Sequence, residues 1–318
     1  MMQLHGIHHV TAVTGNVKLN LDFYTRVLGL RLVKKTVNQD DVSAYHMFYA
    51  DKRGTPGTDM TFFDWPQTGP NVRGTDSIVN TMFRVNGSAA LEYWTTRFHD
   101  HNVKHGGVEP FAGRGIIRFE DPEGQRLTLV DDLGAPFEGE PSTGVDIPLE
   151  YALRGFHGIV LSVPRLQRME PIFTELMNFE KVSEQPSIDD PSETVTIYAM
   201  DGGGPGKEIH VIEQPNLQPG FLGRGGVHHA AFRLKDDAEQ QAWLKRLNSL
   251  GVGNSGIIDR YYFKSLYFRI SNGILFELAT DGPGFATDEP LETMGERLAL
   301  PPFLEPRRKE IEAGLQPV

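Results

Sequence analysis

The chain has 318 residues, of which 39% are hydrophobic and 10% aromatic, and a formal net charge of −11. This length suits a folded protein of two domains, and the acidic balance argues against nucleic acid or an anionic membrane as the main partner. The absence of cysteine excludes disulfides, thiolate zinc sites and cysteine nucleophiles. No apolar run approaches the roughly 18 residues that span a bilayer, and no signal peptide is visible. A cytoplasmic location is therefore the default expectation.

One order of elements recurs along the chain. The first copy opens on the strand-like run IHHVTAV and continues into a helix whose apolar residues have 3.6-residue spacing. Asn16 is expected to cap this helix and Gly29 to end it, and DMTFFDW is expected to be the closing strand. The sequence thus predicts repeats of a βαβββ module, which begin near residues 6, 77, 154 and 226.

The later modules follow the same plan. The second has a predicted helix near 88–101 and closes within 118–132, and the third has a predicted helix near 167–177 and a last strand at 207–213. The fourth opens on GVHHAAFRL and closes on NGILFEL. Each therefore offers a first strand, a helix and a closing strand at equivalent places.

These modules predict an α+β fold in which four βαβββ modules form two open barrel-like domains. A linker rich in Gly, Pro and Glu (134–152) separates two halves. We expect residues 1–140 to hold the first pair of modules and residues 150–283 the second pair. Residues 284–318 form a tail rich in Pro and charge, which is expected to wrap the body.

Paired histidines open the first and the fourth modules. His8 and His9 begin one strand, His228 and His229 begin the other, and Glu277 lies on the last strand of the chain's fourth module. Two histidines and one carboxylate on strands are the ligand set of a non-haem Fe(II) oxygenase, which leaves three metal positions open for substrate and oxygen. The pattern therefore favours an enzyme.

The phrases HHVT, LDFYTRVLGLRLV, HHAAF and NGILFEL resemble the vicinal-oxygen-chelate superfamily, which includes glyoxalases, bleomycin-resistance proteins and extradiol dioxygenases. More narrowly, IHHVTAVTGN with LGLRLVKKTVNQDD and the tail LPPFLEPRRKEIEAGL resemble the hydroquinone-specific ring-cleaving dioxygenases. The resemblance covers essentially the whole chain. It implies the vicinal-oxygen-chelate fold and a metal-dependent attack of O2 on an aromatic ring.

The resemblance also implies one ligand position on the first strand of each module. These positions hold His9, Asn80, Gly158 and His229 in chain order. The last strands offer Phe62 or Phe63, Thr128, about His210, and Glu277, so only His9, His229 and Glu277 complete a metal site. Catechol enzymes take a histidine from the third module, where this chain has Gly158 with His157 one residue out of phase. Modules one and four are therefore expected to share a cavity around the metal, and modules two and three to form an empty one.

Strand alternation places Ile7, His9 and Thr11 on one face and His8 on the other. The resemblance selects His9 and His229 as the ligands and implies that His8 and His228 lie in the second coordination shell. Thr11, two residues past His9, is a further site candidate.

Two more candidates lie in DRYYFKSLYFRI, a predicted turn followed by a strand. Tyr267 should share the face of Glu277 and could hydrogen-bond a substrate oxygen, while Arg260 could stabilise a bound phenolate. As isolated residues they fit better as a packing tyrosine and a surface arginine, and it is the resemblance that favours a role in the site. The remaining histidines are expected to be surface or structural residues: His46, His99, His101, His105 and His210.

The sequence leads us to expect an Fe(II)-dependent dioxygenase that opens a hydroquinone-type aromatic diol with O2, with Mn(II) as an alternative metal. An extradiol catechol dioxygenase, a glyoxalase-type isomerase or lyase and a non-catalytic aromatic- or drug-binding protein of the same fold stay as alternatives. A glyoxalase-type enzyme would need a fourth protein ligand, and module one offers no acidic residue for it. No nucleic-acid or membrane partner is expected, and a homo-oligomer is left open.

Overall fold

The computed structural model describes residues 2–144, 146–270 and 272–318. It confirms the α+β fold of four βαβββ modules. In the first module the Asn16 side chain accepts a hydrogen bond from the Leu19 amide (3.1 Å), and the helix ends before Gly29, whose φ is +73°. The first module contains β1 (Ile7–Thr14), α1 (Val17–Asp22) continued by a π-helical turn (Phe23–Val27), β2 (Arg31–Val37), β3 (Tyr45–Ala50) and β4 (Asp59–Asp64).

The other modules keep this order of elements. Only the third lacks a regular α-helix; it has a 3-10 turn (Leu166–Arg168) and a π-helical turn (Ile172–Leu176) among the described residues. Module two contains β5 (Ser77–Val85), α2 (Ser88–Asp100), β6 (Glu109–Phe111), β7 (Arg114–Glu120) and β8 (Arg126–Asp131); module three contains β9 (Phe156–Val163), β10 (Glu180–Pro186), β11 (Thr194–Ala199) and β12 (Glu208–Glu213); module four contains β13 (Val227–Leu234), α3 (Asp237–Ser249), β14 (Asn254–Asp259), β15 (Lys264–Arg269) and β16 (Leu275–Thr280).

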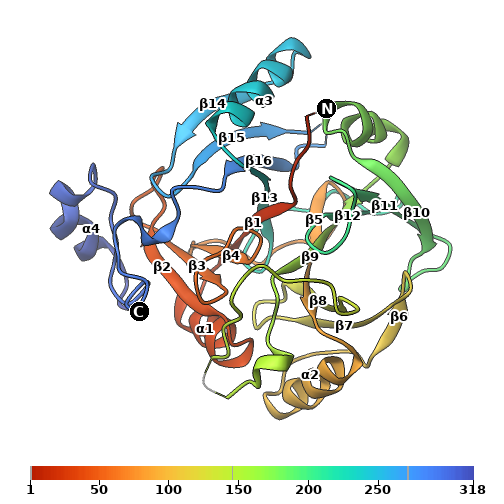
Figure 1. The fold of residues 1–318 in the computed structure, drawn as a ribbon, viewed down its shortest axis with the longest axis horizontal. Helices are drawn as coiled ribbons and strands as arrows, with labels where there is room; N and C mark the ends of the chain where they lie inside the picture. The colour runs from red at the N-terminus through yellow and green to blue at the C-terminus, as the bar shows by residue number, and fades with distance from the viewer. Residues whose placement is uncertain (1, 145, 271) are drawn as a thin grey trace.

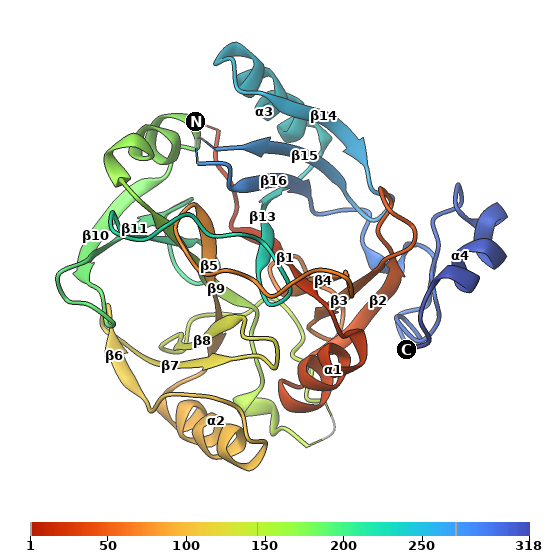
Figure 2. The ribbon, with the colours of Figure 1, turned by 180° about the vertical axis from the view of Figure 1, so that it is seen from behind.

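Within the described residues these strands form two eight-stranded sheets (Figures 1 and 2). One sheet has the order β14-β15-β16-β13-β1-β4-β3-β2 and joins modules one and four. The other has the order β10-β11-β12-β9-β5-β8-β7-β6 and joins modules two and three. The sheets therefore group the strands differently from the sequence halves 1–140 and 150–283, because the first strands pair across the halves, β1 with β13 and β5 with β9.

Each of these first strands carries a β-bulge. The register of β1 against β13 skips His8 on one strand and His228 on the other, and β5 against β9 skips Val79 and His157. A bulge adds one unpaired residue and changes where neighbouring side chains point. The expected alternation is therefore wrong before His9: Ile7 lies in the hydrophobic core with Val10 and Ala12 rather than on the face of His9.

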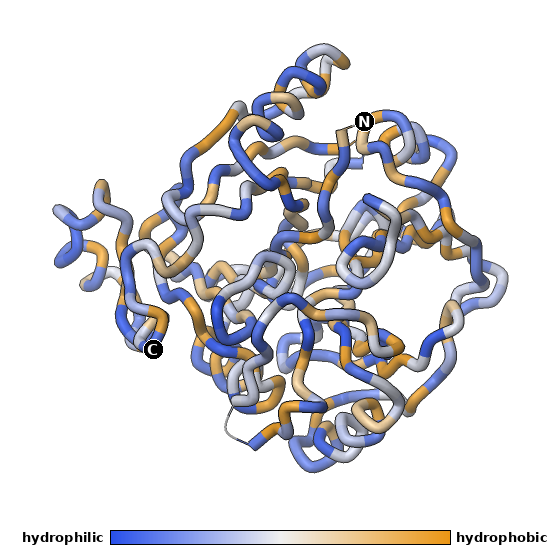
Figure 3. Tube along the Cα trace, in the orientation of Figure 1, coloured by the Kyte–Doolittle hydropathy of each residue, from blue (hydrophilic) through white to orange (hydrophobic). Residues whose placement is uncertain are grey.

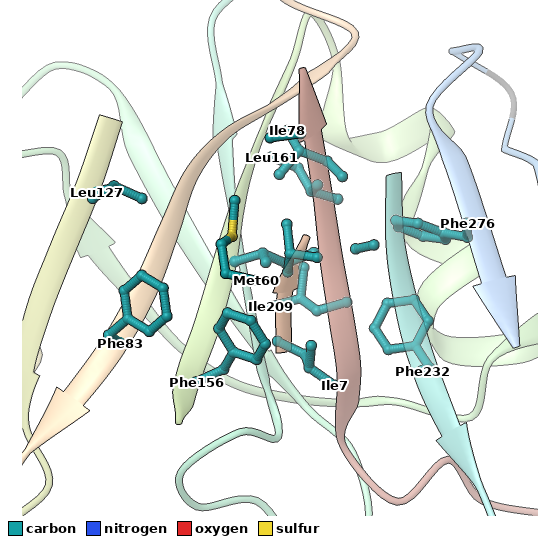
Figure 4. Close-up of a cluster of buried hydrophobic side chains, with 14 of the residues drawn as sticks. Ile7, Met60, Ile78, Phe83, Leu127, Phe156, Leu161, Ile209, Phe232 and Phe276 are labelled. Atoms are coloured by element: carbon teal, nitrogen blue, oxygen red, sulfur yellow. The ribbon is translucent and has the colours of Figure 1, made fainter. Parts of the chain in front are cut away.

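A hydrophobic core extends across both sheets. Its side chains come from the inner strands of all four modules, and Figure 4 shows Ile7 and Phe232 from one sheet near Phe156 and Phe83 from the other. Hydrophobic and hydrophilic positions alternate along the strands (Figure 3), as expected where one face of a sheet is buried. One face of each sheet thus packs in this core, and the other face is left to form a cavity.

The tail lies against the outer strand β2 (Figure 1). Buried Lys34 on β2 donates hydrogen bonds to Glu289 (2.5 Å) and Asp288 (2.7 Å). Farther along, Leu300, Leu304 and Ile311 of the tail pack on Val37, and the last helix is α4 (Arg308–Gly314). The tail therefore holds β2 in place. Among the described residues, no helix has the length and apolar character needed to cross a membrane.

Candidate metal centre and surrounding cavity

His9, His229 and Glu277 meet on the inner face of the sheet that joins modules one and four. They lie on β1, β13 and β16, and all three side chains are buried. Glu277 Oε2 lies 3.2 Å from His9 Nε2 and 3.0 Å from His229 Nε2, and the two Nε2 atoms are 3.4 Å apart. Two imidazole nitrogens and one carboxylate oxygen from three strands, each able to bind a metal, therefore converge on one point.

This spacing fits a metal ion. Metal–ligand bonds of about 2.1 Å at right angles place neighbouring ligand atoms about 3.0 Å apart. Glu277 Oε1 accepts a hydrogen bond from Ser265 (2.5 Å), whereas Oε2 makes no hydrogen bond of normal geometry to the described residues. Burial favours a higher pKa for Glu277, but the neighbouring histidines hold that pKa well below its ordinary value. The carboxylate is thus ionised, with one oxygen directed at the two imidazoles.

The bulge residues His8 and His228 each contact the neighbouring histidine of the triad. His8 Nδ1 lies 2.9 Å from His9 Nδ1, and His228 Nδ1 lies 2.7 Å from His229 Nδ1. Burial first, and the adjacent histidine next, lower the pKa of both His8 and His228 to about 3. Both rings are therefore neutral and can accept the Nδ1 proton of the neighbouring His9 or His229, which would leave the Nε2 atoms of His9 and His229 available to a metal.

A cavity of about 310 Å³ opens in front of this triad. It is lined by His9, His229 and His228, but not by His8 or Thr11. Aromatic rings form much of its wall, together with polar residues that follow β2; the wall includes Phe48, Phe63, Trp65, Tyr262, Phe263, Asn38, Gln39 and Asp40. An apolar, aromatic wall with a few polar groups is typical of a site for a small organic ligand.

Arg260 and Tyr267 both line the cavity. Tyr267 pairs directly with Glu277 across β15 and β16, and thus lies on the same face of the sheet. The Arg260 guanidinium lies 5.5 Å from the centre of the Tyr267 ring and makes a two-pronged ion pair with Asp40 (3.0 and 2.8 Å). Burial favours a lower pKa for Arg260, but Asp40 and Tyr267 raise it, so the guanidinium stays charged at the cavity.

Thr11 lies behind the cavity, fully buried. Its hydroxyl is 2.8 Å from that of Thr61, which is 2.9 Å from His46 Nε2. Thr61 pairs with Thr11, two residues beyond His9, so the position equivalent to Glu277 in module one is Thr61 and not Phe62 or Phe63. The structure thus puts a hydroxyl, not a second carboxylate, at this position.

His46 was expected at the surface or in a structural role, but it lines the cavity. Its ring packs on Phe48 and Phe63, with centroid distances of 4.0 and 4.4 Å. Burial keeps its pKa well below the ordinary value. The sequence did not indicate this role, because the strand of His46 holds no ligand position. Alternation along β3 was the available signal, since it places His46 on the same face as Phe48, two residues later.

His210 was also expected at the surface or in a structural role, and the structure places it in the interior. It is buried, and its Nε2 lies 2.9 Å from Glu208 Oε2. His157, on the bulge of β9, reaches the same oxygen (3.2 Å). The one-residue offset of His157 therefore does not turn it away, because the bulge changes its direction. His99 is exposed, and His101 and His105 are partly exposed.

Replacing Ser265 with Ala should weaken metal binding at the triad of His9, His229 and Glu277, the first triad, by about 10- to 100-fold, the usual effect of losing a group that orients a ligand. Its hydroxyl is the donor that holds Glu277 Oε1. Equilibrium dialysis with Mn(II), carried out in Glu208→Gln proteins so that the cluster of His157, Glu208 and His210 does not add to the bound metal, would measure this change. An exposed serine, Ser249, is the matched control, and an unchanged affinity in the Ser265→Ala protein would show that Glu277 needs no such support.

Comparisons with known proteins agree with this geometry. The family model described as "Glyoxalase/Bleomycin resistance protein/Dioxygenase superfamily" matches residues 6–129 and 155–281. MhqA of Bacillus subtilis, named as a candidate ring-cleaving dioxygenase, is 46% identical over 317 residues that cover 100% of both chains. The chlorohydroquinone/hydroquinone 1,2-dioxygenase of Sphingobium indicum is 32% identical over 98% of this chain and 97% of its own.

Solved structures give the same result for the fold. A crystal structure of a candidate dioxygenase from Bacillus subtilis superimposes with a TM-score of 0.89 at 37% identity, over 100% of this chain and 98% of that one. Glyoxalase I from Zea mays superimposes with a TM-score of 0.63 at 14% identity, over 87% and 92% of the two chains, which shows likeness of fold alone. Because the family model matches both halves and the relatives align over nearly their whole lengths, the chain belongs to the glyoxalase/bleomycin resistance protein/dioxygenase superfamily.

Proposed function

We propose that the protein is an Fe(II)-dependent dioxygenase that opens hydroquinone-type aromatic rings with O2. The observation that carries this proposal is the convergence of His9, His229 and Glu277 beside an aromatic-walled cavity. Three protein ligands leave positions for a substrate oxygen and O2. The relatives named for ring cleavage and for hydroquinone support the reaction and the substrate class.

Bound Fe(II) would supply electron transfer between the aromatic ring and O2, and Mn(II) is the alternative metal. The protein's own groups have separate parts. His8 and His228 hold the ligand rings in one tautomer through their Nδ1 contacts. Arg260 offers a fixed positive charge to a substrate phenolate, and the Tyr267 hydroxyl offers a hydrogen bond to a substrate oxygen. Phe48, Phe63 and Trp65 exclude water around an aromatic ring.

Three alternatives have less support. A catechol enzyme with a ligand from module three would need His157 near the first triad, but His157 lies in the other sheet with Glu208 and His210. A glyoxalase-type enzyme with a fourth protein ligand meets the Thr61 hydroxyl at the remaining position. A non-catalytic ligand-binding role would not explain why Glu277 carries an ionised carboxylate in a buried position. A cytoplasmic location and homo-oligomer formation stay predictions.

Iron-loaded protein should open hydroquinone and incorporate two oxygen atoms from labelled O2 into a ring-opened product. Shape discrimination in an apolar pocket is worth roughly 10- to 200-fold, so we expect the kcat/KM for hydroquinone to exceed that for catechol by at least about tenfold. Mass spectrometry of the product separates this reaction from oxidation to quinone, which also consumes O2. The Glu277→Gln protein carried through the same loading is the control, and faster cleavage of catechol would reject the hydroquinone assignment.

A further inference from the structure

The sheet that joins modules two and three encloses a second cavity, of about 610 Å³. It is twice as large as the cavity at the first triad. Much of its wall is apolar and comes from a small hydrophobic cluster that includes Met82, Ile116, Val130, Phe111 and Val160. Polar groups placed in such a wall lose water and are costly unless they interact with one another or with a ligand.

Three such groups meet in this wall: His157, Glu208 and His210. Both imidazole Nε2 atoms face the same carboxylate oxygen, with Glu208 Oε2 3.2 Å from His157 and 2.9 Å from His210. The corresponding distances at the first triad are 3.2 and 3.0 Å. Both histidines are nearly inaccessible, at 1% and 3% exposure, and their rings are almost perpendicular (86°).

The fold builds this second triad differently from the first. His210 pairs with Val160 across β12 and β9, as Glu277 pairs with Ala231 across β16 and β13, so His210 has the place of the first triad's carboxylate. Glu208 precedes it by two residues on the same face of β12. The histidine position of β9 is Gly158, and the preceding bulge supplies His157 instead. All three groups thus come from module three.

We propose that His157, Glu208 and His210 bind a divalent first-row transition metal ion in the second cavity. Two imidazoles and one carboxylate are a complete ligand set for such an ion. One carboxylate leaves the ion with a net positive charge, and its open positions face the cavity, where water or an oxygen donor of a small molecule would complete the coordination. This proposal does not depend on the function proposed for the first triad.

The competing explanation is a metal-free triad in which both histidines donate hydrogen bonds to Glu208. That arrangement also satisfies the carboxylate, but it binds no ion. The two explanations differ in the number of metal ions per chain. Exchanging Glu for Gln at either triad keeps the side chain's shape and removes the charge that a divalent ion requires, so each triad can be tested separately.

Chelator-treated protein should be titrated with Co(II), which binds nitrogen and oxygen sites more tightly than Fe(II) or Mn(II). Calorimetry gives the stoichiometry, and the visible absorption of Co(II) reports its coordination. We expect two ions per wild-type chain, one in Glu208→Gln, one in Glu277→Gln and none in the double variant. His210→Gln should behave as Glu208→Gln does, and exposed His99→Gln should keep both ions. Thermal unfolding followed by circular dichroism confirms that each variant is folded.

Equal Co(II) stoichiometry in wild-type and Glu208→Gln proteins would overturn the second metal site, as would a Glu277→Gln protein that binds no ion. If instead wild type and Glu277→Gln each bind one ion and Glu208→Gln binds none, the second site stands and the metal centre of the proposed function fails. The titration therefore separates the two proposals.

Discussion

Replacing Glu277 with Gln should remove the metal ion from the first triad and abolish ring cleavage together. Gln keeps the volume of the buried side chain and its contact with Ser265, but it lacks the negative charge that faces His9 and His229. Losing an outer-shell partner of a metal usually costs 10- to 100-fold in affinity or activity. Losing one of the metal ligands themselves should therefore lower kcat/KM by more than about a hundredfold.

The cleanest measurement uses the Glu208→Gln background, in which the second triad does not contribute to metal content. In that background Glu277→Gln, His9→Ala and His229→Ala should each bind almost no iron by elemental analysis. The single Glu208→Gln protein is the matched control and should keep its iron and its activity. Near-stoichiometric iron in any of the three double variants would exclude that residue as a ligand.

Replacing Arg260 with Ala should keep the iron and slow turnover. A hydrogen bond to a charged group contributes roughly 1.5–3 kcal/mol, so loss of a contact made in the transition state lowers the rate by about 10- to 150-fold. Tyr267→Phe should have a smaller effect, seen mainly in kcat, because the Tyr267 hydroxyl is expected to bond a neutral substrate oxygen. Neither side chain is one of the three proposed ligands, so the metal content should stay near wild type.

Asp40 makes the Arg260 test more specific. Because two hydrogen bonds to the Asp40 carboxylate hold the Arg260 guanidinium, Asp40→Asn should keep the charge of Arg260 but loosen its position, with a loss of turnover smaller than that of Arg260→Ala. Exposed Lys245, on α3 of the same module, is the control for removing a positive charge. Wild-type turnover in both Arg260→Ala and Tyr267→Phe would assign these side chains to packing and leave only the metal ligands in the reaction.

The sequence predicts the modules well because their signals are local. Helix spacing, the cap at Asn16 and the turn at Gly29 each depend on a few neighbouring residues, and all three lie where expected. The grouping of modules one and four also follows from the ligand types, since the complementary residues lie near the two ends of the chain. The convergence of His9, His229 and Glu277 could therefore be predicted from the sequence.

The errors come from the bulges and from pairing between distant strands. Period-two alternation cannot indicate where an extra residue enters a strand, so Ile7 and His157 were placed on the wrong faces. Thr61 was missed because its position depends on the register of β4 against β1, which the closing-strand pattern alone does not give. The contact of His210 with Glu208 was missed because Glu208 lies outside the position compared between modules.

The pairing of β1 with β13 has a consequence for how the chain is made. During synthesis from the N-terminus, all strands of the sheet that joins modules two and three have been made once residue 213 is complete. β5 can then pair with β9. β1 cannot pair with β13 until module four has been made, since His229 follows His9 by 220 residues. Until then, the backbone groups on the edge of β1 that pairs with β13 lack their hydrogen-bond partners. The first triad cannot exist before Glu277 has emerged. A nascent chain halted after module three would therefore hold the complete second triad but only one ligand of the first.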